Sequence, residues 1–334
     1  RLFSEHSNLQ VVCGGPLLVH ERQGFNERVP TIILYCHAKG IKPYGEKEFP
    51  SQLIFDGKII PVDIREGYFA LAYGAKWYSD LCMGISVGEQ GKEEYGTLGP
   101  FVDLSGGRYG FITCAHVVGT EGTYVVQPSD KDGGRSAEDR QQDNVCGHVL
   151  RRVRSGSFSI VEDSFTKIVG MDAALVELNG RRRGVPVGFP HIQEAVFNAV
   201  GIDKAASLQY DDNSNCQISS DVIKYGRTTD LTMGKVVLKG TMLKPLSMEM
   251  QYDHTTTYIM KGIDLINGIN PRRRFAEKGD SGSGIFKTDG NKTLSLVGLV
   301  LGTMVAKNDT RCAMLPIKYV LRALQIAPDE LKLI

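Results

Sequence analysis

The chain has 334 residues, of which 42% are hydrophobic and 23% are charged, and its formal net charge is +1 at pH 7. This balance is ordinary for a globular protein and gives no support for a nucleic-acid partner or a membrane partner. No apolar run approaches the roughly 18 residues that a membrane-spanning helix needs. The length allows two or three packed domains.

Cysteine usage bounds the redox chemistry of the chain. The seven cysteines are Cys13, Cys36, Cys82, Cys114, Cys146, Cys216 and Cys312. Their number is odd and no two form a C-x-x-C pair, which argues against a structural zinc site and a dense disulfide framework. We therefore expect buried free thiols, which slightly favours an intracellular location. A secreted location stays open because N-x-T sequons occur at Asn291 and Asn308.

Residues 1–80 are predicted to form an N-terminal accessory module, either α+β or mainly β. A short apolar run of β type spans Thr31–Tyr35. Two further apolar runs, Leu53–Phe55 and Lys58–Ile64, flank the dipeptide Asp56-Gly57. A D-G dipeptide between alternating apolar runs is a strong signal for a β-hairpin.

From about Met83 the sequence changes to short β-type runs separated by glycine turns. Thr97–Leu104 and Arg108–Cys114 are predicted to form a hairpin around Ser105-Gly106-Gly107. The later strand candidates are Thr123–Gln127, Ile168-Val169, Ala173–Leu178, Asp221–Tyr225, Lys235–Lys239, Tyr258–Ile263 and Ser295–Leu301. The polar residues 128–144 are expected to form a surface loop.

The C-terminal region predicts a helix. Ile317–Ile326 has apolar residues at helical spacing and follows Pro316, which suits a helix N-terminus. Many short strands with one terminal helix indicate Greek-key barrels or sandwiches. Three basic clusters are expected to lie in solvated loops: Arg151, Arg152 and Arg154; Arg181–Arg183; and Arg272–Arg274.

One glycine-rich stretch, Lys278–Gly284, reads K-G-D-S-G-S-G. Its composition excludes a helix interior and favours a tight turn. Such a turn can point two backbone N–H groups at the oxyanion of an acyl-transfer reaction. Ser281 is then the candidate nucleophile, and the N–H groups of Gly279 and Ser281 are the candidate oxyanion donors. The alternative is an ordinary surface turn between strands.

A nucleophilic serine needs a base, and all seven histidines precede Ser281. This order excludes Ser before acid before His and leaves His before Asp before Ser. His116 ends the apolar run F-I-T-C-A-H, and Asp172 opens D-A-A-L-V-E-L, where a buried carboxylate can orient an imidazole. Taken alone, a residue like His116 is more often a core histidine with satisfied hydrogen bonds, and one like Asp172 is more often a turn residue or a helix cap. Asp163 is a second candidate acid that lacks an apolar strand behind it.

Together these motifs resemble those of the chymotrypsin-like (trypsin-fold, PA clan) serine proteases of bacterial type. T-C-A-H-V-V resembles T-A-A-H-C, D-A-A-L-V-E-L resembles D-I-A-L-L-x-L, and G-D-S-G-S-G resembles G-D-S-G-G-P. Y-G-R-T-T-D-L-T-M-G is similar to the segment that opens the second barrel of these enzymes. The resemblance covers roughly residues 83–326.

The resemblance implies a mainly β fold with two antiparallel Greek-key barrels and a C-terminal helix. It places the first barrel in residues 81–218 and the second barrel in residues 219–334. It also implies a serine endopeptidase that acts on polypeptides through an acyl-enzyme, with the triad His116, Asp172 and Ser281 and no metal or organic cofactor.

Two departures from the family pattern stand out. Val117 occupies the place of the cysteine that follows the catalytic histidine, so the disulfides of the secreted animal enzymes are missing. In those enzymes a freed N-terminus inserts against the aspartate before the nucleophile, which is Asp280 here. About eighty residues precede the barrels in this chain, which speaks against that route and favours a chain that folds active.

Specificity is carried over from the family only in part. In the family, the residue six positions before the nucleophile lines the primary pocket. The resemblance assigns this position to Phe275, and Ala276 follows it. Leu301 and Gly302 lie in the strand that resembles the one beside bound substrate. No acidic residue is present there, which argues against a preference for Lys or Arg, and Phe275 favours an apolar pocket. A preference for acidic substrates stays open because of Arg272–Arg274.

The N-terminal pattern loosely resembles a module that precedes this fold in some bacterial proteases and in the plant narrow-leaf protease group. It suggests a regulatory role or homo-oligomerisation through residues 1–80. Two other functions remain alternatives: a catalytically latent protease-fold protein that binds or regulates, and an esterase that uses the same three residues.

Overall fold

A computed structural model describes residues 2–6, 8–22, 25–36, 39–66, 75–78, 80–132, 144–162, 165–179, 202, 207–210, 216–243, 259–269, 274–288, 293–306 and 309–332. The chain divides into two compact units. Unit 1 comprises Arg1–Leu71, Ile192–Ala206 and Gly290–Lys292, and unit 2 comprises Ala72–His191, Ser207–Asp289 and Thr293–Ile334. In the described ranges, no helix is both long enough and apolar enough to cross a bilayer.

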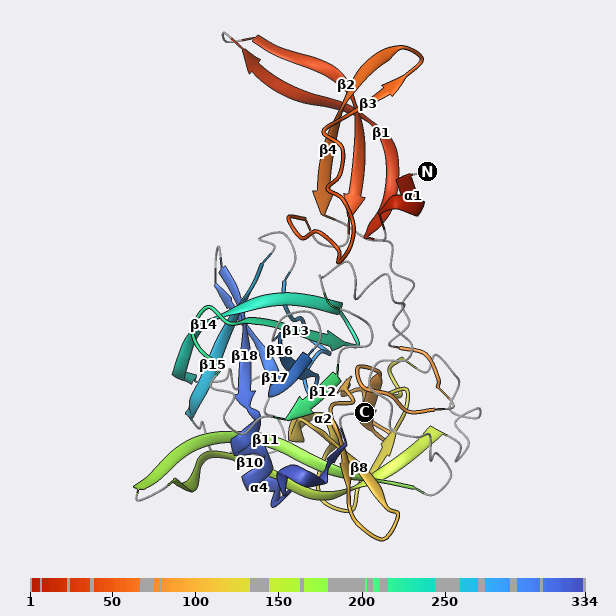
Figure 1. Ribbon diagram of the computed structural model, residues 1–334. Coiled ribbons are helices and arrows are strands. Elements are labelled where there is room, and N and C mark those ends of the chain that lie inside the picture. Colours follow the sequence, from red (N-terminus) through yellow and green to blue (C-terminus); the bar gives the residue numbers. More distant parts are fainter. Residues whose placement is uncertain are drawn as a thin grey trace. The chain divides into compact units, whose positions relative to one another are not determined.

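Unit 1 contains a short helix and a four-stranded sheet in the order β1-β2-β4-β3 (Figure 1). Its elements are α1 (Leu2–Glu5), β1 (Leu9–Arg22), β2 (Phe25–Cys36), β3 (Gln52–Phe55) and β4 (Lys58–Glu66). The predicted hairpin is confirmed, since Phe55 pairs with Lys58 across the turn. Asp56 and Gly57 have φ angles of 48° and 71°, the left-handed pair that a two-residue hairpin turn requires.

The first barrel of unit 2 is one antiparallel sheet in the order β19-β7-β8-β11-β10-β9-β5-β6. Its strands are β5 (Ser86–Glu89), β6 (Gly96–Thr97), β7 (Phe101–Asp103), β8 (Tyr109–Thr113), β9 (Tyr124–Val126), β10 (Val145–Glu162), β11 (Phe165–Leu178) and β19 (Leu331–Lys332). The sheet curls round at the short corner 98–100, which joins β6 to β7. At this corner the N–H of Leu98 donates to Ile85 O at 2.8 Å, and the N–H of Gly99 donates to Ile112 O at 3.1 Å.

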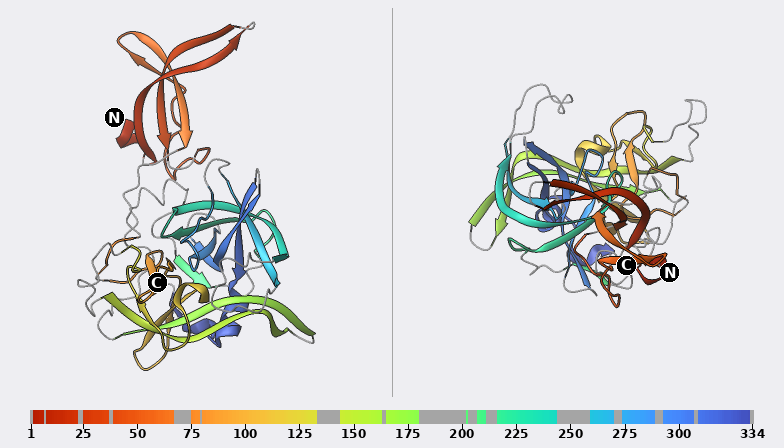
Figure 2. Two further views of the ribbon diagram at one scale, coloured as in Figure 1. Left: turned by 180° about the vertical axis from the view of Figure 1, so that it is seen from behind. Right: turned by 90° about the horizontal axis from the view of Figure 1, so that it is seen from above.

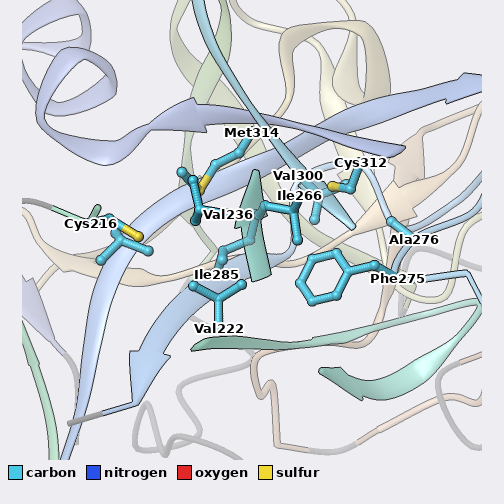
Figure 3. Close-up of a cluster of buried hydrophobic side chains, with 11 residues drawn as sticks. Cys216, Val222, Val236, Ile266, Phe275, Ala276, Ile285, Val300, Cys312 and Met314 are labelled. Atoms are coloured by element: carbon cyan, nitrogen blue, oxygen red, sulfur yellow. The ribbon is translucent and has the colours of Figure 1, made fainter. Parts of the chain in front are cut away.

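The second barrel is a closed ring of six antiparallel strands, because β17 pairs with β18 as well as with β16. Its strands are β13 (Asp221–Gly226), β14 (Asp230–Leu243), β15 (Met260–Gly268), β16 (Gly284–Thr288), β17 (Thr293–Ala306) and β18 (Asp309–Pro316), and β12 (Ser207–Tyr210) pairs parallel to β17. Figure 3 shows its core, where side chains from several strands, among them Val222, Ile266 and Val300, form one buried cluster with Phe275.

The longest hairpin joins β10 and β11 and connects the two barrels. Its strands pair along most of their length and reach β15 of the second barrel. Helix α4 (Ile317–Leu324) lies against this hairpin, as Figure 1 shows and Figure 2 shows from behind. The helix buries Ile317, Val320 and Leu321, and its exposed Arg322 donates from Nη1 to Val161 O of β10 at 3.4 Å.

The predicted fold class is confirmed: the described chain is mainly β, with two antiparallel barrels and a C-terminal helix. The predicted helix over 317–326 ends at Leu324, because Gln325 adopts a left-handed conformation with φ of 53°. The predicted strand over 97–104 is interrupted between Thr97 and Phe101 by the corner that contains Pro100, which has no N–H for a ladder.

One expectation was wrong. Arg151, Arg152 and Arg154 lie on strand β10, not in a solvated loop. They are held there because their backbone pairs with Leu175, Ala174 and Asp172 of β11. Several expectations concern positions outside the described residues. These positions are 133–143, Asp163, Arg181–Arg183, Arg272-Arg273, Asn291 and Asn308. All seven cysteines are described and free, and all except Cys13 are buried.

Closure of the second barrel predicts that alanine substitutions at two glycines of β17 have different effects on stability. A Cβ on Gly298 would lie 2.4 Å from Met314 Cγ and 2.7 Å from Leu315 O, whereas a Cβ on Gly302 would meet nothing within 4 Å. We expect Gly298→Ala to lower the free energy of unfolding by about 2 kcal/mol through overpacking. The matched Gly302→Ala should be neutral or slightly stabilising. Urea denaturation of both variants measures the difference, and equal effects would contradict this account of the closure.

Candidate active site

His116 lies where the first barrel ends its strand β8. The strand stops at Thr113, and the single helical turn α2 (Ala115–Val118) begins at once after Cys114. Ala115, Val117 and Val118 are buried, so they fix the turn against the barrel. The side chain of His116 is 32% exposed, which leaves its ring accessible at the edge of the barrel.

Asp172 contacts His116 twice. It lies on β11 between the buried residues Met171 and Ala173 and is 3% exposed. Its Oδ1 accepts the backbone N–H of His116 at 3.0 Å and lies 3.1 Å from the ring Nδ1. An Nδ1–H that donates to this oxygen leaves Nε2 as the acceptor of the neutral ring. The pair therefore has the geometry of an oriented general base.

The charge state of Asp172 follows from competing effects. Burial disfavours the carboxylate and raises its pKa. The charge and the hydrogen bonds of His116, together with the Arg154 guanidinium, outweigh burial and lower the pKa of Asp172 to about 2. Arg154 contributes through its Nε, which lies 3.4 Å from Asp172 Oδ2. Asp172 is thus an anion across the neutral pH range.

The serine stretch forms a tight turn that only glycine accommodates at two positions. Gly279 and Gly282 have φ angles of 100° and 94°. A Cβ on Gly279 would lie 2.4 Å from Thr228 Oγ1, and a Cβ on Gly282 would lie 2.2 Å from Thr113 Oγ1. Both positions need a backbone conformation that side chains rarely adopt, and both are enclosed. The glycines flanking Ser281 are therefore structural requirements of the turn.

Asp280 anchors this turn from inside the second barrel. It is fully buried, and its Oδ1 accepts the N–H groups of Thr228 at 2.9 Å and Thr229 at 3.1 Å. Its Oδ2 accepts the N–H of Glu277 at 2.9 Å and lies 3.3 Å from Nζ of Lys224, which is also fully buried. Lys224 of β13 thus supplies an internal positive charge to the carboxylate beside the serine.

The first barrel holds the turn from the opposite side. Thr97 donates from its Oγ1 to Gly279 O at 2.8 Å and from its N–H to Ser281 O at 2.8 Å. Cys114, two residues before His116, donates from its Sγ to Val300 O at 3.2 Å. The strand ends that carry His116 and the turn that carries Ser281 are thereby joined at the seam between the two barrels.

The state of the serine itself differs from a fully connected triad. Ser281 is 8% exposed, and its hydroxyl donates to Leu301 O at 3.1 Å. Among the described residues, no hydrogen bond joins Ser281 to His116. The N–H groups of Gly279 and Ser281 likewise donate to no acceptor in the described part of the chain, which leaves both available to a ligand.

The residues expected to contact substrate lie in two environments. Phe275 and Ala276 are each 1% exposed and belong to the core cluster of the second barrel (Figure 3). Leu301 and Gly302 lie on β17 and are partly exposed. The role of Phe275 and Ala276 in a primary pocket stays a prediction, because both fill the barrel core in this structure.

Cys114, His116 and Asp172 offer one sulfur, one nitrogen and one oxygen atom within 4.8 Å of one another, a donor set that suits a soft divalent cation. Two observations speak against metal binding here. Burial, as the largest cause, raises the pKa of the Cys114 thiol, whereas a metal ligand must be a thiolate. The guanidinium of Arg154 also faces Asp172 and repels a cation.

Sequence reasoning missed three residues of this site: Lys224, Thr97 and Arg154. Lys224 is the lone basic residue of the strand candidate D-V-I-K-Y, and a buried lysine requires a partner, which is a usable signal. Thr97 carries no such signal, because its role depends on where the β6 corner meets the second barrel. Arg154 was masked by its position in a basic cluster.

Two antiparallel barrels, with a histidine–aspartate pair on the first and a glycine-flanked serine on the second, make this a chymotrypsin-like protease fold, as the motifs predicted. No family model and no curated protein sequence matches the chain.

Solved structures similar to the chain include three bacterial proteases. Thermobifida fusca protease A is 17% identical with a TM-score of 0.45, over 73% of this chain and 95% of that one. Nocardiopsis protease is 15% identical with a TM-score of 0.44, over 74% and 97%. Cellulomonas bogoriensis chymotrypsin is 16% identical with a TM-score of 0.45, over 76% and 98%.

The buried Lys224–Asp280 pair predicts a large stability effect. We expect Lys224→Met to cost about 3–5 kcal/mol of unfolding free energy, because it leaves a buried carboxylate without its cation. The matched control is Lys235→Met, whose partner Asp221 lies 2.7 Å away and whose pair is about half exposed. That variant should cost about 0–1 kcal/mol. Equal losses in chemical denaturation would show that Lys224 does not support the turn.

The lowered pKa of Asp172 predicts a pH-dependent contribution to stability. A carboxyl with a folded-state pKa of about 2 and an unfolded pKa near ~3.9 stabilises the fold above ~4, and this contribution is lost as pH falls through about 2. Between pH 5 and pH 2 we expect the protein to lose roughly 2 kcal/mol more unfolding free energy than Asp172→Asn, which cannot titrate. Parallel pH curves for the two proteins would contradict this.

Proposed function

We propose that the protein is a serine endopeptidase that hydrolyses peptide bonds through His116, Asp172 and Ser281. One arrangement carries this proposal. An oriented imidazole–carboxylate pair lies at the seam where a turn presents Ser281 together with two unused N–H donors. A base, a nucleophile and oxyanion donors are the three parts that acyl transfer needs.

Acylation begins when the Ser281 hydroxyl turns from Leu301 O to Nε2 of His116. Its Oγ attacks the carbonyl carbon of the scissile peptide while Nε2 takes the proton. The N–H groups of Gly279 and Ser281 stabilise the oxyanion of the tetrahedral intermediate. Asp172 holds the ring and stabilises the imidazolium. When the carbon–nitrogen bond breaks, the leaving amine takes the proton from Nε2.

Deacylation repeats these roles with water. A water molecule gives a proton to Nε2 of His116 and attacks the acyl carbon of the ester on Ser281. The tetrahedral intermediate collapses, the serine oxygen takes the proton back, and the carboxylic acid product leaves. Every proposed proton transfer uses side chains of this chain and water, so the proposal requires no metal or organic cofactor.

A second candidate is a latent protease-fold protein that binds or regulates. The hydrogen bond from Ser281 to Leu301 O at 3.1 Å favours it, because it holds the hydroxyl away from its base. Catalytic hydrogen bonds are often absent in ligand-free sites and form when substrate binds. We therefore rank the peptidase first. An esterase with the same three residues is the remaining alternative.

Fluorophosphonate labelling tests whether Ser281 is activated. We expect the folded chain to be labelled at Ser281, and we expect Ser281→Ala and His116→Ala to reduce labelling at least 100-fold, since each removes nucleophile or base. Ser157→Ala, an exposed serine on β10, is the matched control and should label normally. Undiminished labelling of Ser281→Ala would refute the assignment of the nucleophile.

The substrate class is decided by parallel turnover of a peptide library and matched esters. Peptide cleavage that Ser281→Ala abolishes supports the endopeptidase. Turnover of esters alone favours the esterase. A folded protein that neither labels nor turns over either substrate favours the latent binding protein.

A further inference from the structure

The carboxylate of Asp172 has a second charged neighbour, on the strand beside it. Arg154 of β10 is the register partner of Asp172 on β11, so their side chains start from directly paired positions of the hairpin. Arg154 Nε lies 3.4 Å from Asp172 Oδ2, and the two side chains are 16% and 5% exposed. Such a buried ion pair is weakly screened by solvent and salt.

The two oxygens of Asp172 therefore face different partners. Oδ1 lies against His116, with the backbone N–H at 3.0 Å and Nδ1 at 3.1 Å. Oδ2 lies against the guanidinium of Arg154. A cation on Oδ2 reduces the net negative field at the imidazole. The neutral ring, which is the form that acts as a base, is then favoured over the imidazolium.

Given the hydrolytic function proposed above, we infer that Arg154 is a positioning residue. It holds Oδ2 so that Oδ1 orients His116, and its fixed charge extends the activity of the site to lower pH. A guanidinium suits this role, because it stays charged throughout the pH range in which proteins are folded.

Other ionisable groups near α2 and β11 differ in their effect. Burial raises the pKa of the Cys114 thiol and keeps it neutral. Glu89 of β5 lies next to Gly119 at the end of α2, where a Cβ on the glycine would contact the Glu89 carboxylate. Burial raises the pKa of Glu89. Arg152 of β10 lowers the pKa of Glu89 through its charge and has no ion pair with Asp172.

Charged groups further along β11 pair elsewhere. Glu177 lies 3.2 Å from Arg108 of the β7–β8 turn and 3.8 Å from His148 of β10. Lys167 acts on Asp264 of β15 together with Lys318 of α4. In the described part of the barrel, the cation that faces Asp172 is therefore Arg154.

The test compares Arg154→Gln and Arg154→Met with the charge-conserving Arg154→Lys in the full chain. One readout is the pH titration of the His116 ring nitrogens by NMR, which needs no activity. The other is the pH dependence of fluorophosphonate inactivation. We expect both neutral variants to move both midpoints upward by about one pH unit. Arg154→Lys should restore most of the shift.

Arg152→Gln is the matched control, because it removes a positive charge two residues along the same strand. We expect it to move the midpoints much less. Folded neutral variants with an unmoved ring titration would overturn the inference. Equal shifts in Arg154→Lys and Arg154→Gln, or in Arg152→Gln and Arg154→Gln, would overturn it as well. A wild-type chain that is never labelled speaks against the proposed function, whereas the NMR comparison still decides the role of Arg154.

Discussion

A carboxylate shut off from water needs partners for both of its oxygens, and the turn that carries Ser281 depends on how Asp280 meets this constraint. Its partners are backbone N–H groups of Thr228 and Thr229 and the ammonium of Lys224. Lys224 belongs to β13, and the threonines belong to the turn that follows it. The conformation of the serine turn is therefore determined by strands of the second barrel and is built as part of its core.

The first barrel also holds the turn that carries Ser281. Thr97 donates to the carbonyl oxygens of Gly279 and Ser281, and these bonds tie both ends of the short segment that carries the nucleophile. The backbone carbonyl oxygen of Thr97 in turn accepts a hydrogen bond from Oγ1 of Thr113, the last residue of the strand that leads into His116. One threonine at a barrel corner thus links base and nucleophile. Docking of the two barrels and assembly of the site are the same event, because neither barrel alone supplies both halves.

The sequence predicted those features that local chemistry determines. The Asp56-Gly57 turn, the strand over Asp221–Tyr225 and the terminal helix follow from residue preferences and periodicity, and the structure confirms them. Strand β10 was missed because its arginines and serines resemble a loop, and only pairing with β11 along most of its length makes it a strand. The partner of Asp280 and the orientation of the Ser281 hydroxyl depend on contacts distant in sequence, which no local pattern encodes.

The site contains two buried carboxylates, and each has a cation from the adjoining strand. Asp280 and Lys224 are fully enclosed, so neither exchanges a proton with a substrate, and their pair is structural. Asp172 and Arg154 instead border an imidazole that is partly exposed. Arginine does not lose its charge, and the carboxylate of Asp172, with a pKa of about 2, keeps its charge above that pH. The imidazole of His116 is therefore oriented by a carboxylate that stays charged near neutral pH, which is what a general base requires of its partner.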